Sequence, residues 1–367
     1  MRIAVIFGTR PEAIKMAPVV RALKAAPGID TRVWSTGQHR EMLAQVLDLF
    51  QIQTDRDLKV MAPDQTLNGL FSRVLSCMEE VLGEERPDRV LVHGDTTTAA
   101  AAATAAFHHR IPIGHVEAGL RSGKLDQPWP EEFNRRVVDV VADHLYAPTE
   151  SARQNLLAEN LGEKHIVVTG NTVVDALLHV KGRIDSEPEL ARSLADRFPQ
   201  LDPSKKLVLV TGHRRENFGQ GFQDICQALH DVSELPDVQV LYPVHLNPNV
   251  RKPVLGLLAD RPNIFLVEPV DYLSFVYLMG RSSVILTDSG GVQEEAPSLG
   301  KPVLVMREVT ERPEAVQAGV VRLVGTNVER IVTSVRSALA EPPRTEIVNP
   351  YGDGAAAARI LGELVRQ

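Results

Sequence analysis

Residues 3–25 read IAVIFGTRPEAIKMAPVVRALKA and contain the pattern of a strand, a turn and a helix. Ile3–Phe7 is a continuous apolar run, which indicates a strand buried on both faces of a parallel sheet. Gly8 permits a tight turn, Pro11 suits the first turn of a helix, and Ala13–Ala25 has a helical pattern. This unit favours a doubly wound α/β architecture.

The same alternation of strand and helix continues along the chain. Further strands are predicted in the first half at Thr31–Ser35, Arg89–His93, Ile111–Val116 and His165–Thr169. Helices are predicted between them at Arg40–Phe50, Leu67–Leu82, Thr97–His108 and Pro130–Val141. The pattern restarts near residue 200, with strands at Leu207–Thr211, Val238–Pro243, Ile264–Val267, Ser283–Thr287 and Pro302–Met306 and a last helix at Ala355–Val365. The sequence therefore predicts two α/β units of similar size, whose ligand site is expected in the cleft between them.

Composition agrees with a globular protein of two domains. The chain has 367 residues, of which 44% are hydrophobic, so disorder of the whole chain is excluded. A net charge of −7 gives no global attraction to nucleic acid or to an anionic membrane. Cys77 and Cys226 are too few for a disulfide framework and are interpreted as reduced core thiols. No stretch approaches the ~20 apolar residues of a membrane helix, and the expected location is the cytoplasm.

Three carboxylates are expected near one edge of the first sheet. Asp95 follows the strand at Arg89–His93, although a helix N-cap is an alternative role for it. Glu117 lies at the end of an apolar strand, where a carboxylate is costly unless it is paired or functional. Glu131 was expected near a third strand end. Acids that converge on one pocket suit proton transfer at neutral pH.

Arg135 stands four residues after Glu131 on the predicted helix. The two side chains therefore share one helix face, where they could form a site carboxylate held by arginine. The alternative is an acid that compensates the helix dipole, with an ordinary surface ion pair.

Anion sites are expected where turns lead into helices. In the first half, Arg10 and Lys15 flank such a turn, and the alternative is an ordinary turn with solvated charges. In the second half, His213 and its neighbouring arginines could hold a diphosphate. The stretch Leu286–Glu295 is the strongest signal, because its Ser-Gly-Gly turn exposes backbone N–H groups before a helix.

The sequence lacks the motifs that are typical of several other activities. Neither GxxxxGK[ST] nor GxGxxG occurs, and Gly219-Gln-Gly221 lacks the third glycine, so bound NAD is not expected. The chain has no HExxH or CxxC motif, and no metal is expected. A serine hydrolase is unsupported because GxSxG is absent.

Seven motifs occur in an order that is seen in one family. They are Phe7–Pro18, Val92–Thr98, Gly114–Arg121, Thr211–Glu216, Thr287–Pro297, Val309–Glu314 and Asn349–Gly354. Over essentially its whole length the chain resembles the bacterial non-hydrolysing UDP-N-acetylglucosamine 2-epimerases.

The resemblance implies a GT-B fold, in which two Rossmann-like domains face a deep cleft, and a homodimer. The expected domains are residues 1–172, with a C-terminal helix at about 352–367 packed back on them, and residues 173–351. Family members interconvert UDP-GlcNAc and UDP-ManNAc for cell-surface polysaccharide synthesis. UDP is eliminated across C1–C2 to give 2-acetamidoglucal and is then added back with the opposite configuration at C2.

The resemblance also implies roles for individual residues. Asp95, Glu117 and Glu131 become acid/base candidates, with His213 as a further catalytic residue and Arg135 as a group that positions Glu131 or the substrate. The diphosphate would be held by Arg10, Lys15, His213 and Arg312, together with Ser289, Gly290 and Gly291. Glu295 would hold the ribose, and Phe275 would lie by the uracil. No cofactor or metal is implied.

One departure from the family concerns activation by substrate at a second site. Activated members have Gln where this chain has Glu41, and Arg where it has Asp64, whereas Gln38 and His39 are kept. Replacing a cation by an acid puts such activation in doubt. Two alternative functions remain open: a hydrolysing relative that releases ManNAc and UDP, and a protein that binds UDP-sugars as a silent sensor or a glycosyltransferase.

Overall fold

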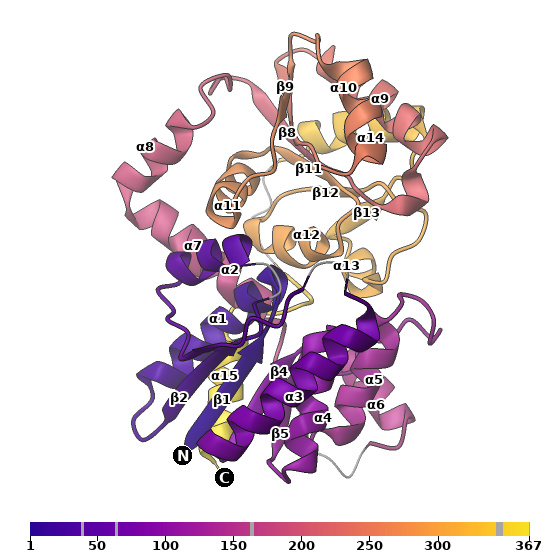
Figure 1. Ribbon diagram of the computed structural model, residues 1–367. Coiled ribbons are helices and arrows are strands. Elements are labelled where there is room, and N and C mark those ends of the chain that lie inside the picture. The colour runs from indigo at the N-terminus through magenta and orange to yellow at the C-terminus, as the bar shows by residue number, and fades with distance from the viewer. Residues whose placement is uncertain (38–39, 63–64, 162–164, 343–347, 367) are drawn as a thin grey trace. The chain divides into compact units, whose positions relative to one another are not determined.

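A computed structural model describes residues 1–37, 40–62, 65–161, 165–342 and 348–366 (Figure 1). The chain divides into two compact units. Unit 1 comprises Met1–Ala176 and Tyr351–Gln367, and unit 2 comprises Leu177–Pro350. Each unit contains its own parallel sheet, so each is described by itself.

Unit 1 has a seven-stranded sheet in the order β3-β2-β1-β4-β5-β6-β7. Its strands are β1 (Arg2–Phe7), β2 (Asp30–Ser35), β3 (Arg56–Asp57), β4 (Arg89–His93), β5 (Ile113–Val116), β6 (His144–Ala147) and β7 (His165–Val168). Its helices are α1 (Arg10–Ala25), α2 (Arg40–Leu49), α3 (Leu67–Glu85), α4 (Thr97–His108), α5 (Glu131–Val141), α6 (Glu150–Ala158), the start of α7 (Thr172–Ser186) and α15 (Ala356–Val365). The order reverses between β1 and β4, the place where open α/β sheets bind ligands.

Side chains of β1 alternate between two buried faces. Ala4 and Ile6 belong to the core that α3 and α4 form on one face, whereas the buried Ile3, Val5 and Phe7 point to the other. Helix α4 consists largely of buried alanines, and their small side chains let it pack directly between α3 and α5 (Figure 1). The continuous apolar pattern of β1 thus results from helices on both faces.

Unit 2 has a six-stranded sheet in the order β10-β9-β8-β11-β12-β13. Its strands are β8 (Lys206–Thr211), β9 (Val238–Pro243), β10 (Ile264–Val267), β11 (Val284–Thr287), β12 (Val303–Val305) and β13 (Val321–Leu323). Its helices, after the end of α7, are α8 (Pro188–Asp196), η1 (Arg215–Asn217), α9 (Gln220–Ser233), α10 (Pro248–Leu258), α11 (Tyr272–Arg281), α12 (Gly290–Glu295), η2 (Ala296–Leu299), α13 (Pro313–Gln317) and α14 (Val328–Ala340). A core of β8, α9 and α14 side chains covers one face of this sheet.

The predicted α/β class is confirmed, and the differences are local. Strand β6 was not predicted, since four residues that begin with a polar His144 give a weak strand signal. The strand predicted from Ile111 begins at Ile113, because Pro112 has no N–H to donate to a neighbouring strand. Glu131 does not lie at a strand end, because β5 ends at Val116 and Glu131 is the first residue of α5.

The boundary between the units falls at Ala176–Leu177 rather than after residue 172. The first turn of α7 belongs to unit 1, because the Asp175 carboxylate accepts hydrogen bonds from the backbone N–H groups of Ala356 (3.2 Å) and Ala357 (2.8 Å). These bonds cap α15, which packs against α1.

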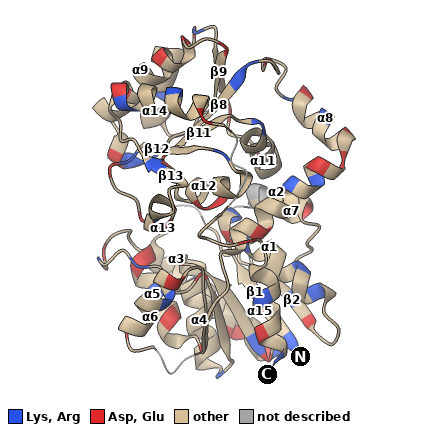
Figure 2. Ribbon diagram, turned by 180° about the vertical axis from the view of Figure 1, so that it is seen from behind, with Lys and Arg blue, Asp and Glu red and all other residues tan. Residues whose placement is uncertain are grey.

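Charged residues avoid the centres of the two sheets. Strands β1, β4 and β8 have a charge only at their first residue, and β11 has none, whereas both signs are interspersed on helix α8 (Figure 2). In the part of the chain that the structure describes, no helix combines the length and the apolarity that crossing a bilayer requires.

Candidate active site

Glu117 follows β5 in a strained backbone conformation. Its φ is +69°, a left-handed conformation that is uncommon outside glycine. The N–H groups of Glu117 and Ala118 both donate to the carbonyl oxygen of Tyr146 in β6, at 3.1 Å each. Strain of this kind persists where the surroundings fix it, and it concentrates at functional sites.

Three nitrogen atoms converge on Oε2 of Glu117. The Lys15 ammonium forms an ion pair with it, Asn171 Nδ2 donates at 2.8 Å, and His93 Nε2 lies 3.6 Å away. Burial opposes ionisation, but the Lys15 charge and the His93 ring outweigh it and hold the pKa of Glu117 well below its ordinary value. Glu117 is therefore a carboxylate at neutral pH, which can accept a proton. Lys15, expected at the diphosphate, is engaged with this acid.

Asp95 lies in the loop that follows β4 and contacts the first turns of α5. Its carboxylate pairs with Arg135, and its carbonyl oxygen accepts a hydrogen bond from Asn134 Nδ2 at 2.9 Å. The predicted pair of Glu131 with Arg135 is not formed, since Arg135 turns to Asp95 and, at 3.4 Å, to Glu132. Oε2 of Glu131 is buried and lacks a hydrogen-bond partner among the described residues.

The turn between β1 and α1 binds a carboxylate of its own chain. Glu12 accepts hydrogen bonds from the N–H groups of Gly8 (3.1 Å) and Thr9 (2.8 Å), which completes a capping box. These two N–H groups therefore bind a carboxylate of the chain itself, and the anion site predicted from the cations Arg10 and Lys15 stays a prediction. Glu12 also accepts from the Thr96 hydroxyl at 2.7 Å and so joins the turn to the Asp95 loop. Arg10 is the half-buried first residue of α1.

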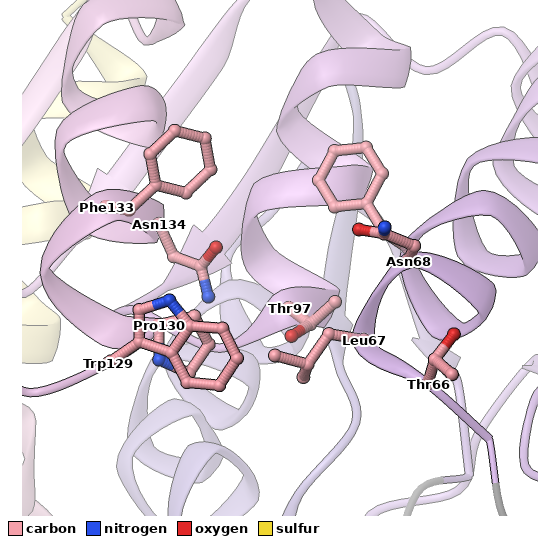
Figure 3. A pocket seen from close by; sticks show the side chains of 9 residues that line it. Thr66, Leu67, Asn68, Thr97, Trp129, Pro130, Phe133 and Asn134 are labelled. Atoms are coloured by element: carbon pink, nitrogen blue, oxygen red, sulfur yellow. The ribbon is translucent and has the colours of Figure 1, made fainter. Parts of the chain in front are cut away.

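A pocket of about 490 Å³ opens beside this part of unit 1 (Figure 3). Its wall is formed by Thr66, Leu67, Asn68, Phe71, Thr97, Trp129, Pro130, Phe133 and Asn134. Trp129 is 69% exposed and Phe133 is 49% exposed, so two large aromatic side chains of the loop before α5 and of α5 itself face solvent here. This pocket was not predicted from the sequence, although a Trp-Pro pair before a helix that begins with two acids was a usable signal.

In unit 2 the loop after β8 is organised by Asp288, at the end of β11. Oδ2 of Asp288 accepts hydrogen bonds from the backbone N–H groups of His213 and Arg214, at 2.8 Å each. The His213 ring stacks on His245 with centroids 5.4 Å apart. Burial lowers the pKa of His213, and Arg214 and His245 add to this effect against the opposing Asp288. Asp288 and His245 were not predicted as site residues.

Two guanidinium groups approach the first residue of α12. A Cβ atom at Gly290 would lie 3.6 Å from Nη2 of Arg214 and 3.7 Å from Nη2 of Arg312. Nε of Arg312 donates to the buried Glu294 carboxylate, which orients the group. Ser289 precedes Gly290 as the N-cap residue, and Gly291 follows it. Arg214 is one of the arginines next to His213 that were predicted to hold a diphosphate. With Arg312 it forms a local cation pair next to Gly290, a suitable anion site.

The predicted ribose and uracil residues lie on α12 and α11. Oε1 of the buried Glu295 accepts a hydrogen bond from the Tyr272 hydroxyl at 2.6 Å. Phe275 is half-buried one turn after Tyr272 on α11. Tyr272, which the sequence analysis missed, therefore orients the carboxylate that was predicted to hold ribose.

Two expectations concern residues without a full structural description. Gln38, His39 and Asp64, which bear on activation by substrate, lie outside the described residues, and the side chain of Glu41 is not described either. Residues 1–37, 40–62, 65–161, 165–342 and 348–366 contain no cluster of three or more metal-ligating His, Cys, Asp or Glu side chains. Cys77 and Cys226 are free thiols.

A pH dependence of stability follows from the position of Glu117. Its folded-state pKa lies below the unfolded value of about 4.3, so the unfolded chain binds more protons in the acid range. The contribution of Glu117 is therefore present above that value and is lost as the pH falls toward the folded-state pKa. As the pH falls over this range, we expect the unfolding free energy of the wild type to decrease relative to that of Glu117→Gln. Urea unfolding at a series of pH values measures it, and a constant difference would contradict the prediction.

The protein has two Rossmann-like units. One carries carboxylates at its strand ends, and the other carries a pair of cations at the start of a helix. These features define the class as a GT-B protein that acts on nucleotide sugars. A sucrose-phosphate synthase from Thermosynechococcus elongatus shares the fold, with a TM-score of 0.66, 14% identity and coverage of 100% of this chain and 98% of that chain.

The family model described as UDP-N-acetylglucosamine 2-epimerase matches residues 21–365. The Escherichia coli K12 protein named UDP-N-acetylglucosamine 2-epimerase is 55% identical over 99% of this chain and 98% of its own length. A Neisseria meningitidis UDP-GlcNAc 2-epimerase, solved with bound UDP-GlcNAc, superposes with a TM-score of 0.92 and 46% identity over 100% of both chains. The chain belongs to the UDP-N-acetylglucosamine 2-epimerase family.

Proposed function

We propose that this protein interconverts UDP-GlcNAc and UDP-ManNAc and retains the sugar as its UDP derivative. The observation that carries the proposal is the Glu117 site, where an ionised carboxylate is held at a strand end by Lys15, Asn171 and His93. Epimerisation at C2 requires a proton acceptor on one face of the sugar and a donor on the other. Membership of the epimerase family supports the same activity.

The proposed reaction is an elimination followed by an addition. A carboxylate takes the proton from C2, the C2–H electron pair forms the C1=C2 double bond, and the C1–O bond breaks with its electrons leaving on UDP. Re-addition of UDP to 2-acetamidoglucal, with a proton delivered to the opposite face of C2, gives the epimer. Asp95, Glu117 and Glu131 are the proposed acid/base groups, with His213 as a further catalytic residue.

The proposed diphosphate groups neutralise the charge of the leaving UDP. Arg214 and Arg312 supply two guanidinium groups next to Gly290, and the backbone N–H groups of Gly290 and Gly291 add donors. Arg10 is proposed as an additional cation at the diphosphate. Glu295, oriented by Tyr272, is proposed for the ribose and Phe275 for the uracil. Arg135 acts on Asp95 in this scheme.

The test is proton NMR of UDP-GlcNAc incubated with the protein in D2O. UDP-ManNAc with deuterium at C2 is the expected product. Free ManNAc with UDP would instead establish the hydrolysing alternative. Binding of UDP without any turnover would overturn the proposal in favour of a silent UDP-sugar-binding protein.

We expect full activity in EDTA and without added NAD. Elimination across C1–C2 needs no net oxidant, and the sequence lacks both the dinucleotide motif and the common metal motifs. The rate of C2 deuteration is measured before and after dialysis against EDTA. Activity that is lost on dialysis and restored by a metal salt or by NAD would contradict the expectation.

We further propose a homodimer that works in the cytoplasm. The two free thiols suit a reducing compartment. Light scattering coupled to size-exclusion chromatography tests the dimer, because a monomer of 40.3 kDa is easily told apart from a species of twice that mass.

A further inference from the structure

A fully buried histidine–aspartate pair lies in unit 1 under the loops that carry the proposed acids. His115 is in β5, two residues before Glu117, and Asp139 is in α5, the helix that begins with Glu131. Both side chains are 0% exposed. The proposed reaction assigns no role to either residue.

Both ring nitrogens of His115 face oxygen atoms. Nδ1 lies 2.6 Å from Oδ1 of Asp139, and Nε2 lies 2.8 Å from the carbonyl oxygen of Gly94. A neutral imidazole has one N–H, so one of its nitrogens would place a lone pair against an oxygen. The imidazolium form can donate to both oxygens.

The Asp139 carboxylate lies between two basic side chains. Oδ1 of Asp139 faces His115, and Oδ2 lies 2.8 Å from Arg121 Nη1. Arg121 Nη2 lies 2.6 Å from the half-buried Glu159, which Arg136 Nη1 also approaches at 3.7 Å. A protonated His115 stabilises the buried Asp139 carboxylate. His115 and Arg121 outweigh the effect of burial and keep the pKa of Asp139 below its ordinary value.

The pair connects the three segments that carry the proposed acids. Nε2 of His115 contacts the carbonyl oxygen of Gly94, the residue before Asp95. Asp139 Oδ2 also accepts the N–H of Gly119, two residues after Glu117, at 3.3 Å. Glu117 has a φ of +69°, a conformation that in a non-glycine residue persists only where the surroundings hold it.

We propose that His115, with a proton on each ring nitrogen and paired with Asp139, is a positioning device that fixes the Asp95 loop, the Glu117 loop and helix α5 relative to one another. His115 and Asp139 do not touch the reacting atoms in this scheme. The kinetic consequence rests on the proposed epimerisation, whereas the protonation state of His115 can be measured without any substrate.

The first experiment is ¹⁵N NMR of the imidazole rings in histidine-labelled protein. The His115 signals are assigned by their loss in His115→Gln, or in the wild type by their couplings if that variant does not fold. We expect both ring nitrogens to carry a proton at pH 7. A neutral ring would overturn the proposal.

The second experiment compares Asp139→Asn with Asp231→Asn. Asp231 forms a similar pair with His230, at 3.1 Å, but on the surface of unit 2, so it is a matched control. We expect kcat of Asp139→Asn to fall about 10- to 100-fold with little change in KM or in UDP affinity, and kcat of Asp231→Asn to stay at the wild-type value. Wild-type kcat in a folded Asp139→Asn would overturn the positioning role. Absence of turnover in the wild type would overturn the proposed function, while the NMR result would still decide the state of His115.

Discussion

Glu117→Gln is expected to lower kcat by about two to four orders of magnitude. The amide keeps the shape of the side chain and can still accept hydrogen bonds from Lys15 and Asn171, but it cannot take a proton from C2. UDP affinity should change little, because the proposed diphosphate groups other than Arg10 belong to unit 2. The measurement pairs the rate of C2 deuteration in D2O with calorimetric titration of UDP.

Glu150→Gln is the matched control for this substitution. Glu150 is also in unit 1, but its side chain is 61% exposed and pairs only with its helix neighbours Arg153 and Gln154. Its kcat should equal that of the wild type. Because Glu117→Gln leaves the Lys15 ammonium without its carboxylate, both variants are assayed at a temperature where circular dichroism shows them folded. Near-normal turnover in folded Glu117→Gln would remove Glu117 from the chemistry.

Gly119→Ala is expected to destabilise the protein by about 3 kcal/mol. Gly119 has a φ of +84°, which penalises any L side chain. An added Cβ would also lie 2.3 Å from the carbonyl oxygen of Ala152 and 2.8 Å from Cγ of Leu156. Because the first of these atoms belongs to the backbone of α6, relief requires a shift of that helix or of the turn after Glu117.

Gly28→Ala separates the cost of the positive φ from the cost of the steric clash. Gly28 has a similar φ of +79°, but an added Cβ would find no atom within 4 Å. It should therefore show only the conformational cost, about 1 kcal/mol. Urea midpoints of the two variants and the wild type give the comparison. Equal midpoints for Gly119→Ala and Gly28→Ala would show that the turn yields without cost and would refute the steric argument.

The positions of the site residues along the chain could be predicted from sequence. Continuous apolar runs mark strands covered on both faces, and parallel strands all end at one edge, so Asp95 and Glu117 were predicted near each other. The Ser-Gly-Gly turn before α12 was also predictable, because glycines between a strand and a helix favour a turn that presents backbone N–H groups.

The same reasoning could not predict the partners of the charged residues. An i,i+4 pair stabilises a helix by only a few tenths of a kcal/mol, which is too little to prevent Arg135 from pairing with Asp95 instead of Glu131. Lys15 and Glu117 are 102 residues apart, and nothing local to either predicts their ion pair. The signals of His115 and Asp139 were equally ambiguous, since neither residue shows its burial or its partner in the sequence.

The sequence by itself determined the two α/β units, the strand ends that carry the carboxylates and the glycine turn of unit 2. Each of these depends on hydrophobic runs and on turn-forming residues that act within a few positions. The tertiary structure alone decided that Glu12 fills the turn before α1, that Lys15 keeps Glu117 ionised and that Arg214 joins Arg312 at Gly290. Those contacts depend on burial and on charges from distant segments, and electrostatic energies of this kind are set by the folded environment.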